Sequence, residues 1–219
     1  MSDPLPSGTV VVLREAPRLE LLLLRRRPRD GKRGPWVFPG GKVEADDARG
    51  ARDDAEAARR AAVRECAEEA GLRLAPQGLV EISRWITPPV SPRRFDTFFF
   101  ATRVEPDAPV RVDGEEMDEH RWITPADSLR AHHESEVKLA PPTFVTVTWL
   151  AEFARVEDAL SALPARRPAP FHPRIHRTGA GACILYPGDA GYEAGEIECS
   201  GPRHRLWMQD AWRYERNGL

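Results

Sequence analysis

The sequence has few cysteines and no long apolar run, and each absence excludes a class of protein. Only 3 of the 219 residues are cysteine, and an odd number at irregular spacing does not make a disulfide framework. The longest apolar stretch, LELLLL at residues 19–24, is far shorter than the roughly 20 residues that span a bilayer. The N-terminus also lacks the basic and then apolar segments of a secretory signal. We therefore expect a cytoplasmic protein with free thiols and no membrane partner.

A strong net charge is missing too. The 32 basic and 34 acidic side chains leave a formal charge of −2, so no overall field favours nucleic acid or an acidic membrane. Lysine is scarce while arginine, alanine and proline are plentiful, a bias typical of a bacterium with a GC-rich genome. Hydrophobic residues make up 41% of the chain, which is enough to bury a core. We therefore predict a globular protein and no nucleic-acid partner.

Strand and helix patterns alternate through the first three quarters of the chain. The apolar, β-branched stretches predict strands at residues 8–15, 18–26, 36–41, 78–87, 94–104 and 119–123. The helix-forming stretches predict helices at residues 53–70, 124–132, 141–154 and 156–163. Asp53 or Asp54 can cap the first helix, Gly71 can end it, and Thr124 and Pro125 can begin the second. This order predicts an α/β layer fold in a domain of residues 1–163.

The composition changes after residue 163. Prolines crowd PARRPAPFHP at residues 164–173, which predicts a linker. The stretches 179–195 and 204–215 predict short strands and tight turns. Residues 164–219 are therefore expected to form a linker and a small β-rich extension.

The stretch RECAEEAGL at residues 64–72 places three glutamates on one side of a helix. Glu65, Glu68 and Glu69 gather opposite an apolar stripe that includes Cys66, and they repel one another at this spacing. Arg64 lies four residues before Glu68 and is expected to pair with it. The cluster is either a solvated helix face or a site for a hard divalent cation such as Mg²⁺. Without the cation, one of the three carboxyl groups is expected to have a raised pKa.

A longer pattern surrounds these glutamates. The chain matches Gly-x5-Glu-x7-Arg-Glu-U-x-Glu-Glu-x-Gly-U, in which U is aliphatic, and so resembles the signature of the Nudix hydrolases. The fixed positions are met by Gly50, Glu56, Arg64, Glu65, Glu68, Glu69, Gly71 and Leu72. Cys66 at the first U position is a mild departure. The resemblance implies a Nudix-type α/β/α sandwich with a mixed sheet, followed here by the β-rich extension.

The first glycine of the pattern has two candidates. Gly50 matches the formal spacing, but the family's glycine normally belongs to a Gly-Gly turn directly after a strand. That context is carried by WVFPGG at residues 36–41. We therefore favour Gly41, with an insertion of nine residues before Glu56.

The resemblance also implies a chemistry. Nudix enzymes hydrolyse a nucleoside diphosphate linked to another moiety, with Mg²⁺ or Mn²⁺ as cofactor. The resemblance implies that Glu65, Glu68 and Glu69 are metal ligands, together with the carbonyl oxygen of Gly40. Gly41 and Gly71 become structural positions, as do Glu56 and Arg64, which are expected to form an ion pair.

The general base differs between members of the family. It is either a glutamate of the helix, here Glu65 or Glu68, or one from a distant loop. The acidic stretch DGEEMDEHRW at residues 113–122 supplies Glu116, with Glu115 as the alternate. An acidic surface loop is the competing interpretation of that stretch.

The substrate is inferred from a narrower resemblance, to the coenzyme A and acyl-CoA diphosphatase-like branch, over roughly residues 8–155. The upstream signature of the CoA-cleaving enzymes is met at Arg25 and Gly34, but Leu23 replaces its threonine and Asp30 its second arginine. The arginines expected to bind substrate phosphates are Arg25, Arg27, Arg33 and Arg94.

CoA or acyl-CoA is the favoured substrate, and ADP-ribose, NADH or a similar dinucleotide is the alternative. A non-catalytic module that senses a nucleotide, and a nucleic-acid binder acting through residues 25–33, are the competing classes. The sequence leaves open whether the chain forms a homodimer.

Overall fold

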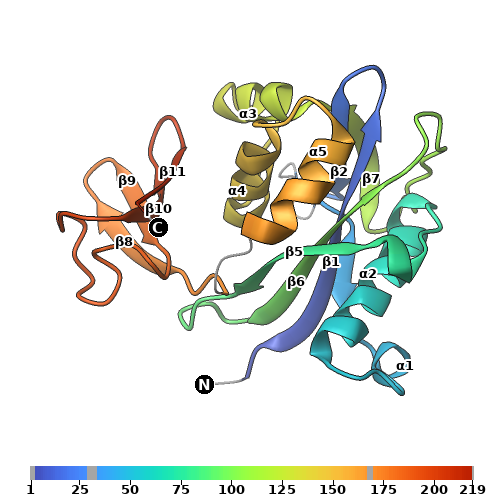
Figure 1. Cartoon of the computed structure of the whole chain (residues 1–219), viewed down its shortest axis with the longest axis horizontal. Helices are drawn as coiled ribbons and strands as arrows, with labels where there is room; N and C mark the ends of the chain where they lie inside the picture. The colour runs from blue at the N-terminus through green and yellow to red at the C-terminus, as the bar shows by residue number, and fades with distance from the viewer. Residues whose placement is uncertain (1–2, 29–33, 167–169, 219) are drawn as a thin grey trace.

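The computed structural model describes residues 3–28, 34–166 and 170–218 (Figure 1). Its central sheet consists of β1 (Leu5–Glu15), β2 (Leu19–Arg26), β3 (Trp36–Val37), β4 (Gly40–Lys42), β5 (Val80–Ile86), β6 (Phe95–Arg103) and β7 (Met117–Ile123). The strand order is β3-β2-β1-β6-β5, with β4 also paired to β1 and β7 to β2. Because β1 and β6 run parallel while the other pairs are antiparallel, the sheet is mixed, as predicted.

The near-continuous apolar runs of β1 and β2 follow from burial of the sheet on both faces. Successive side chains of a strand point to opposite faces. Val11 and Leu13 of β1 join one hydrophobic core, whereas Val10 and Val12 join a second core. A strand that is buried on both faces therefore has apolar residues at consecutive positions, without alternating polar ones.

Helices cover both faces of this sheet (Figure 1). On one face lie α1 (Ala45–Ala48) and α2 (Asp54–Ala70), and on the other lie α3 (Pro125–His133), α4 (Pro141–Leu150) and α5 (Val156–Ala162). Two 3₁₀ turns, η1 (Pro76–Gly78) and η2 (Leu163–Arg166), complete this part of the chain. The architecture is the predicted α/β/α sandwich.

The helix boundaries follow from local sequence. The side chain of Asp53 accepts a hydrogen bond of 2.8 Å from the Glu56 N–H and caps α2. Gly71 ends α2 in the left-handed conformation, with a φ of 69°. Thr124 caps α3 by accepting from the Asp127 N–H, and Pro125 occupies its first turn. These predictions are confirmed, whereas α4 ends at Leu150, earlier than predicted.

A second, four-stranded antiparallel sheet follows. It consists of β8 (Arg174–Thr178), β9 (Gly181–Leu185), β10 (Arg203–Met208) and β11 (Arg213–Asn217), in the order β11-β10-β9-β8. The β-rich extension was predicted, but β8 was not. Its sequence RIHRT alternates weakly and directly follows the prolines.

The segment predicted as a linker is partly buried. Phe171 is fully buried and stacks on Trp85 of β5 at 3.7 Å between ring centroids. Its backbone N–H donates to the carbonyl of Arg84, and its carbonyl accepts from the N–H of Ile86. These contacts attach the extension to the central sheet, although residues 167–169 lie outside the described part. The domain boundary at residue 163 stays a prediction.

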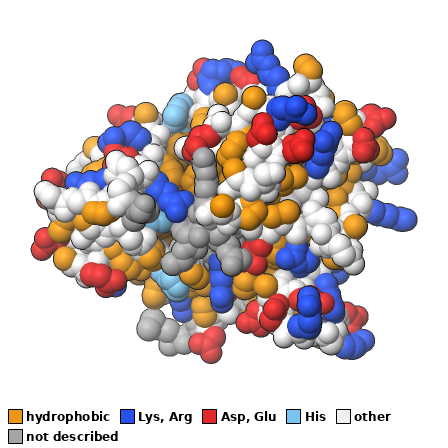
Figure 2. Space-filling view, in the orientation of Figure 1, with side chains coloured by type: hydrophobic (Ala, Val, Ile, Leu, Met, Phe, Trp, Pro, Cys, Tyr) orange, Lys and Arg blue, Asp and Glu red, His pale blue; other side chains and the backbone are white. Residues whose placement is uncertain are grey.

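Charges of both signs are interspersed over the face shown in Figure 2, which agrees with the near-zero net charge. Within the described ranges, no helix is both long and apolar enough to cross a membrane. The three cysteines all lie in those ranges and are free.

Candidate active site

The site forms where α2 packs against the Gly40–Gly41 turn. Glu65 and Glu69 are one helical turn apart, so both side chains project from the same side of α2. The backbone N–H of Gly40 donates a hydrogen bond of 2.9 Å to Oε2 of Glu69. A Cβ atom on Gly41 would lie 2.1 Å from Oε1 of Glu65, a separation that no side chain permits. That oxygen ends a flexible side chain, so a side chain at position 41 would displace the Glu65 carboxylate from the turn.

These carboxylates line a polar cavity of about 480 Å³. The two glutamates of α2 are joined there by Glu116, from the loop before β7, and by Glu44, which begins α1. Arg26 at the end of β2 and Arg93 before β6 also line it, and the remaining lining residues are Ser7, Thr9, Gly40, Gly41, Lys42, Phe95 and Thr97. Four carboxylates and two guanidinium groups thus share one pocket, called the acidic pocket below.

Burial dominates the electrostatics of the acidic pocket. Glu69 is only 3% exposed, and burial raises its pKa to about 8, although the N–H of Gly40 opposes the shift. Burial likewise raises the pKa of Glu65, against the pull of the neighbouring Arg64 guanidinium. The prediction of a raised pKa is confirmed. Its main cause is burial rather than repulsion among glutamates, and the prediction that Glu69 faces away from the interior is wrong.

Glu68 lies apart from the other two glutamates. Its side chain is 57% exposed and pairs with Arg64 at 2.8 Å, the pairing that the sequence predicted. It is not among the described residues that line the acidic pocket. Its assignment as a metal ligand or base stays a prediction without geometric support.

The predicted ion pair between Glu56 and Arg64 is wrong. Eight residues of α-helix separate the two Cα atoms by about 12 Å along the axis. Glu56 instead pairs with Arg52 and Arg60, and these contacts lower its pKa to about 2. Arg64 pairs with Asp47 of α1 and donates to the carbonyl of Lys42, so it ties the insertion to α2. Both residues therefore make ion pairs, but not with each other, and their structural role in the motif stays a prediction.

Of the predicted phosphate-binding arginines, the three in the described residues do not line the acidic pocket. Arg25 pairs with Asp118 and Glu119, and Arg27 donates to the carbonyl of Gly114. Arg94 donates to the carbonyl of Thr87, and Arg33 lies outside the described residues.

Two arginines next to these residues in the sequence lie in the acidic pocket instead. Arg26 and Arg93 line the acidic pocket. Neither was among the arginines selected from the sequence. The substrate roles of Arg25, Arg27, Arg33 and Arg94 remain untested predictions.

The donor set of the acidic pocket fits a hard divalent cation. Over the part of the chain that is described, no group of three or more His, Cys, Asp or Glu side chains is arranged to hold a metal ion. Glu65 and Glu69 nevertheless face the same turn and offer carboxylate oxygens. Mg²⁺ and Mn²⁺ prefer such ligands, and Mg²⁺ commonly takes its remaining ligands from water and substrate phosphates. These two glutamates are therefore the residues that would hold the metal.

The two candidate glycines of the motif can be distinguished by substitution. Gly41→Ala is expected to displace the Glu65 carboxylate and lower kcat at least about tenfold, because the added methyl group occupies its place. Gly50→Ala is expected to leave kcat unchanged, since none of the described atoms lies within 4 Å of a Cβ built there. Its positive φ of 66° should cost about 1–2 kcal/mol of stability. Kinetics and thermal melts of both variants check this, and equal loss of activity would contradict it.

Comparison with known proteins places these residues in a family. The family model described as the NUDIX domain matches residues 4–141. The acyl-coenzyme A diphosphatase NUDT19 of Homo sapiens is 32% identical over 183 residues, which are 78% of this chain and 47% of that protein. The chain therefore spans about half the length of this relative.

Solved structures are similar over the same region. A NUDIX hydrolase from Alicyclobacillus acidocaldarius aligns with a TM-score of 0.65 and 27% identity, covering 74% of this chain and 98% of that one. The NUDIX domain of Shewanella oneidensis NrtR, complexed with ADP ribose, aligns with a TM-score of 0.52 and 15% identity, covering 68% and 86%. The second likeness concerns the fold alone.

Proposed function

Because the chain belongs to the Nudix family, we propose that it is a pyrophosphohydrolase that cleaves the diphosphate of CoA or an acyl-CoA and requires Mg²⁺ or Mn²⁺. The observation that carries this proposal is the acidic pocket. Glu65 and Glu69 face the Gly40–Gly41 turn there, with Glu116, Arg26 and Arg93 in the same cavity.

Five charged groups of the acidic pocket have a role in this proposal. Glu65 and Glu69 would hold the divalent cation, which would neutralise negative charge on the phosphoryl oxygens. Arg26 and Arg93 bind phosphate oxygens through their guanidinium groups. Glu116 accepts a proton from the water that attacks phosphorus. The new P–O bond forms as the bridging P–O bond breaks, and the second phosphate ester departs.

The substrate class rests on two observations. The human relative that covers 78% of this chain is named as an acyl-CoA diphosphatase. The acidic pocket also opens beside a largely apolar cavity, which suits a substrate with an uncharged arm next to its diphosphate.

A hydrolysis screen tests the proposal. The purified protein is incubated with CoA, octanoyl-CoA, ADP-ribose, NADH and capped RNA, each with Mg²⁺ or Mn²⁺, and the products are identified by mass. We expect CoA to give 3′,5′-ADP and 4′-phosphopantetheine, and we expect a higher kcat/KM for CoA and octanoyl-CoA than for ADP-ribose, NADH or capped RNA. Preferred turnover of ADP-ribose or NADH would overturn the CoA assignment. Absence of turnover on every diphosphate would overturn catalysis in favour of a nucleotide-sensing module.

A further inference from the structure

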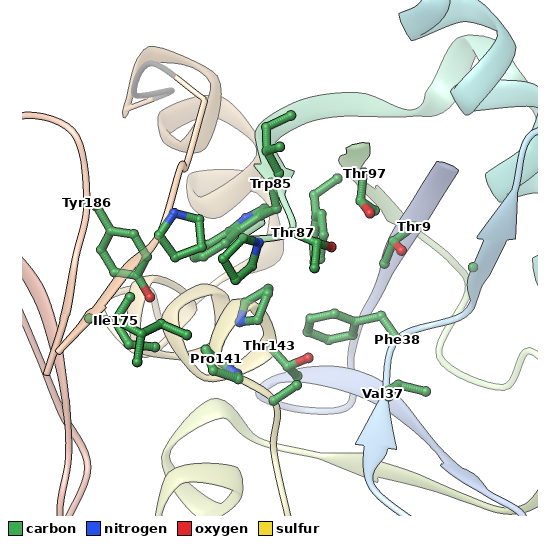
Figure 3. A pocket seen from close by; sticks show the side chains of 18 of the residues that line it. Thr9, Val37, Phe38, Trp85, Thr87, Thr97, Pro141, Thr143, Ile175 and Tyr186 are labelled. Carbon is green, nitrogen blue, oxygen red and sulfur yellow. The ribbon is translucent and has the colours of Figure 1, made fainter. Parts of the chain in front are cut away.

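A cavity of about 410 Å³ lies directly beside the acidic pocket. The two cavities share Thr9, Arg26, Gly40 and Thr97, so a single ligand can extend from one into the other. Figure 3 shows Phe38, Trp85 and Thr97 on the side of the central sheet, with Tyr186 and Ile175 across from them. We call this cavity the apolar chamber. Its size falls in the range of about 300–1,000 Å³ that is usual for small-molecule sites.

The apolar chamber is built by both parts of the molecule. The central sheet and the start of α4 contribute aromatic rings, prolines and threonines. The C-terminal region contributes Pro173, Ile175, Ile184 and Tyr186. The stacking of Phe171 on Trp85 and its backbone hydrogen bonds to β5 help to hold this far wall in place.

The chemistry of the lining selects one end of a diphosphate substrate. Among the described lining residues, Arg26 alone is charged, and it stands at the boundary with the acidic pocket. A phosphorylated nucleoside would bring charge and hydrogen-bonding edges into a chamber that offers few partners for them. An uncharged, flexible arm has no hydrated charge to lose when it enters the chamber. Removal of its apolar surface from water favours binding.

Tyr186 adds a polar group to the C-terminal wall. Its side chain is fully buried, and its hydroxyl has no hydrogen-bond partner among the described residues. Burial raises the pKa of this phenol well above its usual value, so it remains a neutral donor. Figure 3 shows the hydroxyl beside Ile175. A carbonyl oxygen of a ligand would satisfy this otherwise unpaired O–H.

Ile175 stands where the apolar chamber opens. This large hydrophobic side chain is 48% exposed, in contrast to Ile184 on the neighbouring strand, which is 4% exposed. The two residues are direct partners in the β8–β9 ladder. An aliphatic chain leaving the chamber would cover the exposed part of Ile175.

We propose that the apolar chamber receives the non-nucleotide arm of the substrate, and that Ile175, Ile184 and Tyr186 of the C-terminal sheet select for an acyl group at its end. This inference rests on the proposed function and deepens it. It assigns the diphosphate to the acidic pocket and acyl selectivity to the second sheet. The enzyme should then prefer medium-chain acyl-CoA to free CoA.

Substitutions at the opening of the chamber test the inference in the full-length protein. Ile175→Trp narrows the opening, and Ile175→Asp places a charge on the path of the chain. Arg177→Trp is the matched control, because Arg177 is exposed on the same strand and does not line the chamber. Tyr186→Phe removes the hydroxyl alone. The measurements are kcat and KM for CoA, acetyl-CoA, octanoyl-CoA and palmitoyl-CoA.

Both Ile175 variants are expected to lower kcat/KM for octanoyl-CoA about tenfold, mainly through KM, and to lower it by a smaller factor for CoA, which lacks the acyl chain. Tyr186→Phe is expected to raise KM for the thioesters but not for CoA, and Arg177→Trp to match the wild type. Unchanged acyl preference in the Ile175 variants of an enzyme that cleaves CoA would overturn the chamber's role and leave the proposed function standing. A wild type that cleaves no CoA compound would overturn both.

Discussion

Glu69→Gln should lower kcat for diphosphate hydrolysis by about 10²-fold or more and yet stabilise the metal-free protein. The loss of activity follows because a neutral amide is a poorer ligand for a divalent cation than a carboxylate. The gain in stability follows because a carboxylate that is 3% exposed is costly to ionise. The amide can still accept the hydrogen bond from the Gly40 N–H.

The stability effect has a definite pH dependence. The pKa of Glu69 is about 8 in the folded protein, against an ordinary value of 4.5. Between these values the folded state keeps a proton that the unfolded state releases, so stability falls as pH rises through this window. With EDTA present, the increase in Tm caused by Glu69→Gln should be small at pH 5 and largest at pH 8 and above.

The matched control is Glu134→Gln, at an exposed position in an ordinary ion pair with Arg130. It should change neither kcat nor the pH dependence of Tm. Full activity of Glu69→Gln, or a drop in its Tm at pH 8, would show that Glu69 has another role.

Asp189→Ala should cost about 3–5 kcal/mol of unfolding free energy, the largest stability effect that we expect. Asp189 accepts two hydrogen bonds from Arg205, from Nε at 2.8 Å and from Nη2 at 2.6 Å. The two side chains are 0% and 2% exposed. Removal of the carboxylate leaves the guanidinium buried without its counter-charge. Urea unfolding measures the loss.

Two further variants make this prediction specific. Glu134→Ala breaks an exposed ion pair and should cost less than about 1 kcal/mol. Replacing the buried pair together, as Asp189→Leu with Arg205→Met, should restore much of the stability, since no charge is then left unpaired. Equal urea midpoints for Asp189→Ala and Glu134→Ala would contradict the account of the C-terminal sheet.

The same pair predicts sensitivity to acid. Burial disfavours the charged form of Asp189, but hydrogen bonds from Arg205, His204 and Gly191 outweigh it and lower the pKa to about 2. The resulting stabilisation is present above the ordinary value of 3.8 and is lost as pH falls toward 2.

Local sequence predicted the parts of the site that local interactions build. The caps of α2 and the projection of Glu65 and Glu69 from one side depend on residues close in sequence. Gly41 could be preferred to Gly50 because the strand context was visible in the sequence. A Cβ atom on Gly41 would meet the Glu65 carboxylate, whereas one on Gly50 would stand in open space, and the choice of Gly41 stays a prediction.

Choices between neighbouring residues could not be made from the sequence. Consecutive residues of a strand face opposite ways, so a basic run at residues 25–27 does not show which arginine faces the site. The preceding leucines do not show which residues face the site either. Both faces of β2 are buried, so its apolar residues do not alternate with polar ones. In the structure Arg26 lines the acidic pocket and Arg25 and Arg27 do not, and the register of β2 with β7 shifts between Arg25 and Arg26.

Long-range packing explains the remaining omissions. Glu44 lies in the insertion, and the contact of α1 with α2 was not predicted. The apolar chamber joins β5 to β8 and β9, which are far apart in sequence. Its only sequence signal is the presence of Phe171 and Ile175 in and just after a proline-rich stretch otherwise typical of a linker.

The central claim is that the acidic pocket binds the divalent cation that hydrolysis requires. The most direct measurement is titration of the purified protein with Mn²⁺, with free Mn²⁺ followed by electron paramagnetic resonance. We predict that the wild type and Glu134→Gln bind with equal affinity, and that Glu65→Gln and Glu69→Gln each weaken binding at least about tenfold. Unchanged Mn²⁺ affinity in both pocket variants would contradict the claim.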